Sequence, residues 1–281
     1  LKEVSFPCVV KPLTLSASRG VIRADSPSEL EAAIVRLSNL LRSTSVLSRR
    51  EQTSDTILLE EYIPGRELAI EGFVTNGQFR VLTIFDKPDP LEGPFFEESI
   101  YVTPTSLTEF EQRRVERQVD AAIRSLGLTH GPVHAECRLG SGSVFVLEVA
   151  PRSIGGLCSR VLRFEGPRED VVFEEMILRH ALSEPVDQYR LASEAAAVMM
   201  MPVPEAGVFK KVSGLETARG MPFVEDIIVT AKRDQRFIPW PEGSSYPGFI
   251  FSRGGTAADV VTSLRNAHAA LQFDVDREIP L

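Results

Sequence analysis

The chain has 281 residues, of which 43% are hydrophobic, and it carries 31 Lys and Arg residues against 39 Asp and Glu residues, for a net charge of −8. This length and composition suit one large or two ordinary globular domains and exclude a mainly disordered chain. The acidic balance and the lack of a dense Lys/Arg tract argue against nucleic acid as a partner, because non-specific affinity for phosphate backbones depends on clustered cations.

The sequence gives no signal for a membrane or for secretion. No uninterrupted hydrophobic run approaches the roughly 20 residues that a membrane-spanning helix needs, and the first thirty residues do not have the pattern of a signal peptide. Cys8, Cys137 and Cys158 are odd in number and widely spaced. This spacing predicts reduced thiols, with neither a disulfide framework nor a structural zinc site. We therefore expect a cytoplasmic protein.

The first predicted elements alternate strands with a helix. A strand-like run at 6–10 leads to Lys11, and a Ser/Gly turn at 16–20 separates it from a short strand at 21–22. Ser26-Pro27-Ser28-Glu29 has the form of a capping box, and it opens a helix whose hydrophobic residues recur at helical spacing up to Leu41. The polar stretch 42–55 is predicted to be a surface loop without core residues.

The middle of the chain is rich in strand patterns. Residues 57–61 have the pattern of a buried strand, and two β runs, 66–75 and 78–85, are joined by Asn76-Gly77, a strong hairpin signal. After a loop at 86–98 we expect a helix near 108–126 that ends at Gly127. Two strands at 132–139 and 144–149 follow, and then a helix near 169–182.

From about residue 194 the pattern changes to short β runs broken by Gly and Pro. These runs lie at 196–200, 208–211, 227–230 and 248–251, before a last helix from Thr256 to Leu271. We place a domain boundary between residues 183 and 194. The predicted fold class is therefore α+β, with a small β-rich subdomain at the C-terminal end.

The most informative segment pairs strand 132–139 with strand 144–149. Ionisable residues at 134, 136 and 138 alternate with hydrophobic ones, so one face of the first strand is charged. In a hairpin centred on Gly142, two residues face each other across the strands when their numbers add up to 284. Glu136 and Glu148 are such a pair, and their Cβ atoms would lie roughly 5 Å apart. A hard cation such as Mg²⁺ between the two carboxylates would offset their repulsion. The alternative is a solvated face with salt bridges to Arg138 and Arg152.

Two weaker patterns suggest a nucleotide site. Glu60 and Glu61 close one strand and Glu67 opens the next, so backbone groups and carboxylates at a strand end are available to an adenine edge and to ribose hydroxyls. Lys11 closes the first strand beside a Ser/Gly loop with many free N–H groups, which together suit a phosphate, although the Walker A spacing is absent. Exposed acids at a strand end and a solvated lysine are the alternatives.

In their order and spacing these motifs resemble those of the ATP-grasp enzymes. Residues 6–12 resemble the family's phosphate-binding Lys strand, 18–21 its mobile phosphate-covering loop, and 60–67 its adenine-binding hinge and ribose-binding Glu. Glu136 and Glu148 are similar to its metal-binding acids, and Arg152 to the arginine that contacts the transferred phosphoryl group. The resemblance implies three groups of site residues: nucleotide-binding Lys11, Ser18, Arg19, Gly20, Glu60, Glu61, Tyr62, Ile63 and Glu67; metal-binding Glu136 and Glu148; and catalytic Arg152, His134 and Lys87.

Within this superfamily, the chain resembles the L-amino-acid-ligase-like carboxylate–amine ligases. The likeness is carried by residues 86–88, 93–98, 152–156 and 207–250. It implies an ATP-grasp domain at 1–190, with a small nucleotide-clasping subdomain (1–62) and a metal and catalytic subdomain (63–190), and a C-terminal subdomain at 191–281. Ala150 stands where the family often has Asn, so one metal contact must come from water or another residue.

The resemblance also implies the reaction. A substrate carboxylate, that of an amino acid, attacks the γ-phosphoryl group of ATP, and an amine captures the acyl phosphate, with release of ADP and phosphate. The implied cofactors are ATP and Mg²⁺, with Mn²⁺ as the alternative ion. His134 either contacts the γ-phosphate or the substrate, or is satisfied by neighbouring acids. Lys87 and Arg160 either pair with a substrate carboxylate or are surface cations.

Other functions stay open at this point. One is a purine-biosynthetic carboxylase-like ATP-grasp enzyme, and another is a non-catalytic ATP-binding remnant. The expected partners are a small-molecule carboxylate and an amine, and a homodimer is left open. Ligases of this kind carry a Rossmann-like domain before the Lys strand, whereas Lys11 stands almost at the start of this chain. We therefore expect the chain to be a fragment that lacks that domain.

Overall fold

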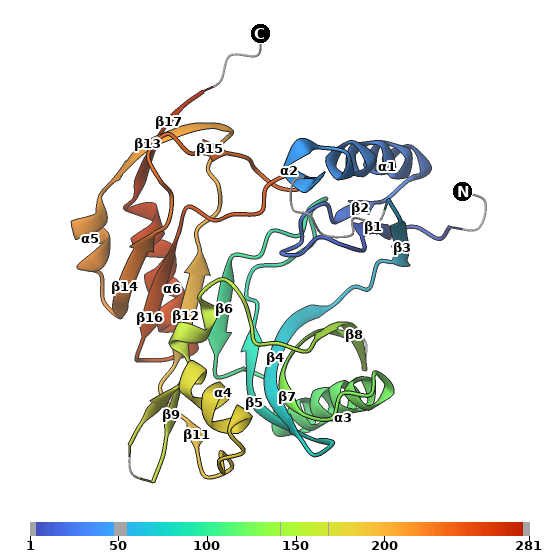
Figure 1. Ribbon diagram of the computed structural model, residues 1–281. Helices are drawn as coiled ribbons and strands as arrows, with labels where there is room; N and C mark the ends of the chain where they lie inside the picture. The colour runs from blue at the N-terminus through green and yellow to red at the C-terminus, as the bar shows by residue number, and fades with distance from the viewer. Residues whose placement is uncertain (1–3, 48–54, 141, 168, 278–281) are drawn as a thin grey trace.

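The computed structural model describes residues 4–47, 55–140, 142–167 and 169–277, and Figure 1 shows how their elements are arranged. A three-stranded sheet near the N-terminus lies above one end of a long eight-stranded sheet, and the C-terminal elements lie beside the other end. Helices cover both sheets, so the predicted mixture of helices and strands is confirmed.

The N-terminal sheet is antiparallel and has β1 (Cys8–Pro12) between β2 (Ile22–Ala24) and β3 (Ile57–Glu61). Helix α1 (Pro27–Leu41) packs on it through its hydrophobic side. Ser26 Oγ accepts the Glu29 N–H, as predicted, but the Glu29 carboxylate accepts the N–H of Asp25 and not that of Ser26. The predicted capping box is therefore only half formed.

Two predictions for this part of the chain are wrong. The segment 42–55 does contain a core residue, because Val46, in the short helix α2 (Thr44–Leu47), is completely buried under α1; residues 48–54 of the predicted loop lie outside the described residues. Strand β3 is not buried either. Leu58 and Leu59 are 36% and 39% exposed, because β3 is an edge strand of its sheet.

The large sheet joins residues from the middle and the C-terminal part of the chain. Its strand order is β14-β16-β12-β6-β5-β4-β7-β8, and all its neighbours pair antiparallel. The strands are β4 (Arg66–Thr75), β5 (Gln78–Asp86), β6 (Ile100–Thr103), β7 (Gly131–Gly140), β8 (Ser143–Ala150), β12 (Ala196–Met200), β14 (Val224–Val229) and β16 (Gly248–Arg253). Strands from both sides of the predicted boundary at 183–194 thus pair in one sheet, and the boundary stays a prediction.

Two hairpins determine how the site-bearing strands face each other. The predicted Asn76-Gly77 turn joins β4 to β5, and both turn residues have positive φ, 51° and 79°. In the β7–β8 hairpin, Glu136 pairs with Glu148 as predicted, so their residue numbers add up to 284. Nearer the turn, Gly140 pairs with Ser143, and the numbers of paired residues add up to 283. The shift lies between Glu136 and Cys137, where Leu147 is the extra residue of a β-bulge.

Helices cover both faces of the large sheet. On one face α3 (Glu109–Ser125) buries side chains of β4 and β7; Thr108 and Glu111 form its capping box, and it ends before Gly127, as predicted. The other face carries α4 (Phe173–Ala181), a 3₁₀ turn (Cys158–Val161) and a small sheet of β9 (Arg163–Glu165), β10 (Val171–Val172) and β11 (Arg190–Leu191). Helix α4 begins later than the predicted residue 169, because residues 171–172 pair with β9.

The C-terminal part adds a further small sheet and two helices. The sheet has the order β15-β13-β17, with β13 (Gly207–Ser213), β15 (Arg236–Phe237) and β17 (Gln272–Asp276). Helix α5 (Leu215–Arg219) and helix α6 (Ala257–Ala269) pack on strands β12, β14 and β16 of the large sheet. Thr256 caps α6 with Asp259, and the helix ends two residues before the predicted Leu271 because β17 begins at Gln272.

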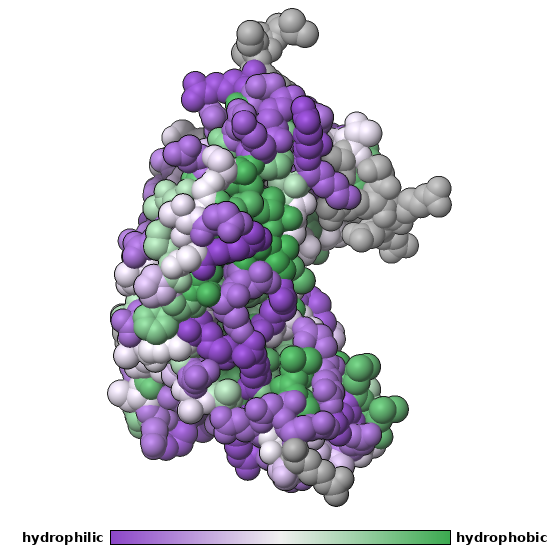
Figure 2. Space-filling view, turned by 90° about the vertical axis from the view of Figure 1, so that its left-hand side faces the viewer, coloured by the Kyte–Doolittle hydropathy of each residue, from purple (hydrophilic) through white to green (hydrophobic). Residues whose placement is uncertain are grey.

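All three cysteines are free and buried, as predicted, and burial raises the pKa of Cys137 to about 12. In the described part of the chain, no helix combines the length and the hydrophobicity needed to cross a membrane. Figure 2, which looks at the side that faces left in Figure 1, shows hydrophilic side chains over much of the surface with hydrophobic ones between them.

The packing of α1 on the small sheet gives a testable consequence. Leu37 is completely buried in this core, so Leu37→Ala should lower the free energy of unfolding by about 2–5 kcal/mol, because it removes apolar contacts and leaves a cavity. Val35 on the same helix is 61% exposed, and Val35→Ala should change that free energy by less than about 0.5 kcal/mol. Urea unfolding of both variants measures the difference, and equal effects would contradict the packing.

Candidate functional site

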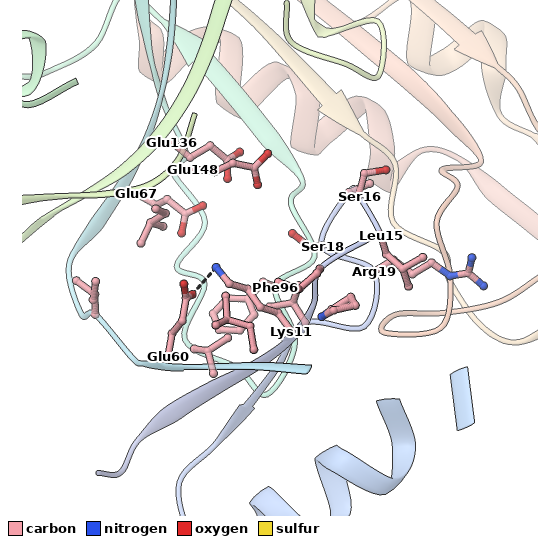
Figure 3. A pocket seen from close by; sticks show the side chains of 18 of the residues that line it. Lys11, Leu15, Ser16, Ser18, Arg19, Glu60, Glu67, Phe96, Glu136 and Glu148 are labelled. Atoms are coloured by element: carbon pink, nitrogen blue, oxygen red, sulfur yellow. Dashed lines mark ion pairs between the residues drawn. The ribbon is translucent and has the colours of Figure 1, made fainter. Parts of the chain in front are cut away.

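A cavity of about 720 Å³ lies between the small sheet and strands β4, β7 and β8 of the large one (Figure 3). One wall is formed by β1, β3 and the loop 15–19, and the other by charged side chains of the large sheet. Most of the predicted site residues line this cavity: Lys11, Ser18, Arg19, Glu60, Glu61, Tyr62, Ile63, Glu67, Glu136, Glu148 and Arg152.

The charged wall follows from the pairing of β4 with β7. Glu67 stands opposite Arg138 in the sheet and Glu71 opposite His134, so each acid faces a base. The Arg138 guanidinium lies 2.8 Å from a Glu67 carboxylate oxygen. His134 Nδ1 contacts the completely buried Glu71, whose other oxygen accepts the N–H of Ile154 at 3.1 Å. The predicted alternative for His134, a histidine satisfied by neighbouring acids, thus describes its contacts.

Glu71 is a site residue that is not among the predicted ones. The signal was present, because Glu67 and Glu71 are four residues apart in one strand and therefore lie on the same face. That face also carries Ala69 and Phe73, which belong to a hydrophobic core. A carboxylate in such a position needs a partner, and His134 on the neighbouring strand provides it.

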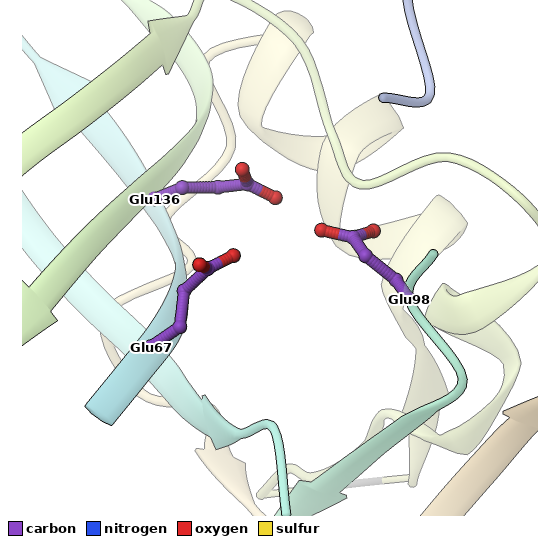
Figure 4. Close-up of side chains that lie close together, drawn as sticks. All are labelled: Glu67, Glu98 and Glu136. Carbon is purple, nitrogen blue, oxygen red and sulfur yellow. The ribbon is translucent and has the colours of Figure 1, made fainter. Parts of the chain in front are cut away.

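Three carboxylates, those of Glu67, Glu98 and Glu136, converge at one point with oxygens within 4.8 Å of one another (Figure 4). Lys87 lies among them: its Nζ is 2.7 Å from Glu67 and 3.0 Å from Glu136, and it also contacts Glu98. The Lys87 side chain is only 3% exposed. The ammonium group therefore neutralises carboxylates of the protein itself, and its predicted pairing with a substrate carboxylate stays a prediction.

Burial and neighbouring charges shift the pKa values of Lys87, His134 and Glu98 in opposite directions. Burial tends to lower the pKa of Lys87, but the carboxylates of Glu136 and Glu98 hold it well above its ordinary value. Burial likewise acts against the charged form of His134, yet hydrogen bonds to Glu136 and Glu71 raise its pKa to about 9. Burial raises the pKa of Glu98 to about 7, although Lys87 opposes this shift. Near neutral pH, Lys87 and His134 are thus cationic.

Glu136 and Glu148 form the candidate metal site. Burial would raise the pKa of Glu136, but Lys87 and His134 hold it below its ordinary value, so this carboxylate is ionised. Glu148 is its partner across the hairpin, is exposed, and lies beside it on the cavity wall (Figure 3). Two carboxylates on neighbouring strands that open into a cavity are a donor set that suits Mg²⁺. The residues therefore fit the predicted ion.

The end of the cavity near β1 and β3, where nucleotide binding is predicted, is also held by contacts within the protein. Lys11 forms an ion pair with Glu60, drawn in Figure 3. The Tyr62 ring lies between the guanidinium groups of Arg23 and Arg138, whose Cζ atoms are 4.1 and 5.0 Å from the ring centroid. Arg138 also donates to the carbonyl of Ile63 at 2.7 Å. The predicted hinge at 60–63 is thus anchored to the charged wall.

Two predicted loop residues face elsewhere. The Arg19 guanidinium points away from Glu136 and Glu148 (Figure 3), and its Nε donates to the carbonyl of Glu242 at 2.8 Å. Gly20 has φ 76°, and a Cβ at this position would lie 2.8 Å from Leu37 Cδ1. Close packing against α1 and the backbone conformation therefore both require glycine here.

A second cavity, of about 560 Å³, adjoins the first. Glu136, Glu148, Arg152 and the loop 16–18 line both cavities, so the carboxylate pair and the loop stand at their junction. The remaining walls come from distant parts of the chain: Glu98, Tyr101, His134, Ser153, Ile154, Gly155, Gly156, Cys158, Met200 and Tyr246. Arg160, considered as a substrate ligand, pairs instead with Asp226 at 3.3 Å. The arrangement can hold one ligand on each side of a shared cation site.

Comparison with known proteins agrees with this geometry. Residues 4–161 match the family model of the ATP-grasp domain, and residues 199–276 match that of the L-amino acid ligase C-terminal domain 2. The alanine–anticapsin ligase of Bacillus amyloliquefaciens is 27% identical over an alignment of 168 positions that covers 55% of this chain and 35% of that protein. The predicted likeness to this group of ligases is confirmed.

Solved structures give the same result. The L-amino acid ligase from Bacillus licheniformis matches with a TM-score of 0.81 and 28% identity, over 98% of this chain and 66% of that one. The N5-carboxyaminoimidazole ribonucleotide synthetase from Thermotoga maritima matches with a TM-score of 0.64 and 16% identity, over 98% of this chain and 64% of that one, which shows a shared fold alone. The chain spans only part of the length of each of these proteins.

The carboxylate cluster around Lys87 leads to a prediction. Lys87→Gln removes the one cation that contacts all three of Glu67, Glu98 and Glu136 and leaves Glu98 without an ion-pair partner among the described residues, so it should destabilise the protein by about 3 kcal/mol or more. Because three carboxylates then remain within reach of one divalent ion, MgCl₂ should raise the melting temperature of this variant more than that of the parent protein. Thermal unfolding with and without MgCl₂ measures both effects.

A matched control comes from the surface. Arg265 pairs with Asp89 at 2.6 Å, and their side chains are 54% and 39% exposed. Arg265→Gln should therefore cost less than about 1 kcal/mol and should respond to MgCl₂ as the parent protein does. A loss for Lys87→Gln no larger than that of this control would show that the ammonium group does not hold the cluster together.

Proposed function

The chain belongs to the ATP-grasp family, and on this basis we propose that it forms the nucleotide, metal and catalytic part of a ligase. The ligase would join a carboxylate, that of an amino acid, to an amine and release ADP and phosphate. One observation carries this proposal: two cavities of about 720 and 560 Å³ share Glu136, Glu148 and Arg152 at their junction. One cavity would hold the nucleotide and the other the carboxylate that receives its γ-phosphoryl group.

The residues of the first cavity would bind the nucleotide. Lys11 at the end of β1 and the N–H groups of the loop 16–20 are available to the α- and β-phosphates, and the hinge at 60–63 to the adenine, with Glu67 near the ribose. Lys11 now pairs with Glu60, so a phosphate would compete with that carboxylate for the ammonium group. When bound, ATP supplies the phosphoryl group that activates the carboxylate.

The residues at the junction would stabilise the transfer. Glu136 and Glu148 would hold Mg²⁺, with Mn²⁺ as the alternative, and this ion supplies charge neutralisation for the phosphate oxygens. Arg152 lines both cavities and carries an exposed guanidinium group, which suits the charge on the transferring phosphoryl oxygens. His134 lines the second cavity and is kept protonated by Glu71 and Glu136. Its Nε2 lies 3.5 Å from Glu136, so a phosphate or carboxylate oxygen would take the place of that carboxylate as the acceptor.

The second cavity supports an amino acid as the carboxylate substrate. Its walls combine cations and carboxylates with the rings of Tyr101 and Tyr246. A free amino acid carries both a carboxylate and an ammonium group, so both signs of charge have a use in such a site. A purine-biosynthetic carboxylase is supported less well, because the solved structure of that kind shares only the fold. A cytoplasmic location agrees with the expected substrates.

The proposed reaction can be tested by the dependence of ADP release on a carboxylate. The chain is incubated with Mg-ATP, an amine and each of a panel of amino acids, and the acyl phosphate is trapped with hydroxylamine. ADP release and hydroxamate formation with one or more amino acids would support the ligase. Bicarbonate in place of the amino acids tests the carboxylase. ATP binding without turnover on any acid would instead identify a non-catalytic nucleotide-binding chain.

The metal assignment has its own prediction. Glu148→Gln keeps the shape of the side chain but removes its charge, and should lower turnover of Mg-ATP by at least about a hundredfold while the fold stays intact. Glu148 is exposed at the cavity, so its loss should leave the melting temperature close to that of the parent protein. Steady-state ADP release measures turnover, and circular dichroism measures the fold.

Glu165→Gln is the control for this variant, because Glu165 is an exposed glutamate on β9, outside the residues that line the two cavities. It should turn over Mg-ATP at the rate of the parent protein. Normal activity in Glu148→Gln would end the assignment of this residue to the metal.

A further inference from the structure

The loop that would cover the phosphates is held by a segment more than 200 residues away. The Ser/Gly turn at 16–20 overlaps the predicted phosphate-covering loop at 18–21, and residues 16–20 are called the phosphate-covering loop from here on. This loop makes three hydrogen bonds to residues 240–242, which follow β15. Trp240 Nε1 donates to the carbonyl of Ala17 at 3.2 Å, the N–H of Gly20 donates to the carbonyl of Pro241 at 2.8 Å, and Arg19 Nε donates to the carbonyl of Glu242 at 2.8 Å. In Figure 1, the chain after β15 extends to the N-terminal unit.

The same segment is also tied to the helix behind the loop. The carboxylate of Glu242 binds the guanidinium of Arg36 on α1 through two hydrogen bonds, one of them 2.8 Å long. Since α1 packs on Gly20 through Leu37, this ion pair fixes the segment 240–242 to the unit that carries the loop. Loop and helix are thus held by the same three residues of the C-terminal subdomain.

The segment is connected at its other side to the second cavity. The Trp240 ring, 5% exposed, packs against the ring of Tyr246 with centroids 4.8 Å apart. Tyr246 in turn lines the second cavity and packs on Phe249 of β16, a strand of the large sheet. A continuous series of contacts therefore runs from the second cavity through Tyr246 and Trp240 to the phosphate-covering loop.

We propose that Trp240 and Glu242 are positioning residues that hold the phosphate-covering loop at the junction of the two cavities. Neither residue lines the nucleotide cavity, so each acts on the nucleotide through the loop. This proposal rests on the proposed function in one respect, because it takes the loop to be the one that binds the phosphates of ATP. It assigns to the C-terminal subdomain an indirect part in nucleotide binding, exerted through the loop.

The proposal predicts a specific kinetic effect. Loss of one such hydrogen bond or ion pair frees the loop before the nucleotide binds, so the nucleotide must then pay the entropy of ordering it. Trp240→Phe removes the donor to Ala17 and keeps an aromatic ring, and Glu242→Gln removes the charge that binds Arg36. Each should raise the KM for ATP about two- to tenfold, as expected for one hydrogen bond, and should change kcat much less.

Limited proteolysis gives a readout that does not depend on turnover. Trypsin can cut after Arg19, which is 5% exposed while its guanidinium is bound to Glu242. Cleavage at this bond, followed by mass spectrometry of the peptide that ends at Arg19, should be faster in both variants than in the parent protein. A non-hydrolysable ATP analogue with Mg²⁺ should slow the cleavage again.

Glu205→Gln is the matched control. Glu205 pairs with Arg277 at 2.6 Å at the surface of the same subdomain, and this pair does not touch the loop. The control should keep the KM and the cleavage rate of the parent protein. The proposal is overturned if Glu242→Gln and Trp240→Phe behave as this control does in both assays. If Trp240→Phe fails to fold, Glu242→Gln, whose side chain is 35% exposed, decides alone.

The two proposals fail in different ways. If the parent chain turns over no amino acid, the proposed function is wrong for this chain, while the rate of cleavage after Arg19 in the variants still decides the role of Trp240 and Glu242. If the parent chain is active and the variants match the control, the ligase stands and the positioning role is lost.

Discussion

The site depends on the compensation of negative charge at the inner face of strands β4 and β7. Glu67, Glu98 and Glu136 bring their carboxylates within 4.8 Å of one another. Two like charges about 4 Å apart repel by on the order of 4 kcal/mol at an effective dielectric constant of about 20. Lys87 offsets this repulsion, and because Lys87 and Glu98 stand at the two ends of the loop between β5 and β6, the loop must close over the sheet for them to meet.

The hairpin of β7 and β8 shows both the reach and the limit of sequence reasoning. Counting from Gly142 pairs Glu136 with Glu148, and this pair is present. The register that produces this pair differs from the predicted one. Near the turn the numbers of paired residues add up to 283, and the bulge at Leu147 shifts this sum to 284 at the two glutamates. A bulge depends on how the strand fits its neighbours, which a pattern of alternating residues does not encode.

The same distinction separates the predicted residues from the missed ones. The Asn76-Gly77 turn, the helices that begin near Thr108 and Thr256, and the charged face of β7 are local patterns, and the sequence predicts them. The position of Glu71 on the same strand face as Glu67 is also a local pattern, but its role is not, and Val46 could not be recognised in this way at all. Each acquires its role from distant contacts, Glu71 from the strand that carries His134 and Val46 from the underside of α1. Likewise, nothing near Arg19 indicates that its partner is Glu242.

The order of strands in the large sheet connects these long-range contacts to one another. One continuous hydrogen-bonded sheet runs from β8, which carries Glu148, to β16, which leads from the segment that holds the phosphate-covering loop. The small sheet is not part of it, and lies against it through the loop 92–95 and the segment 240–242. The carboxylates of the proposed metal site and the segment that supports the loop 16–20 therefore belong to one scaffold. A shift of the small sheet toward or away from the cavity must work against the hydrogen bonds between the loop 16–20 and the segment 240–242, so the C-terminal part of the chain restrains one wall of the cavity without lining it.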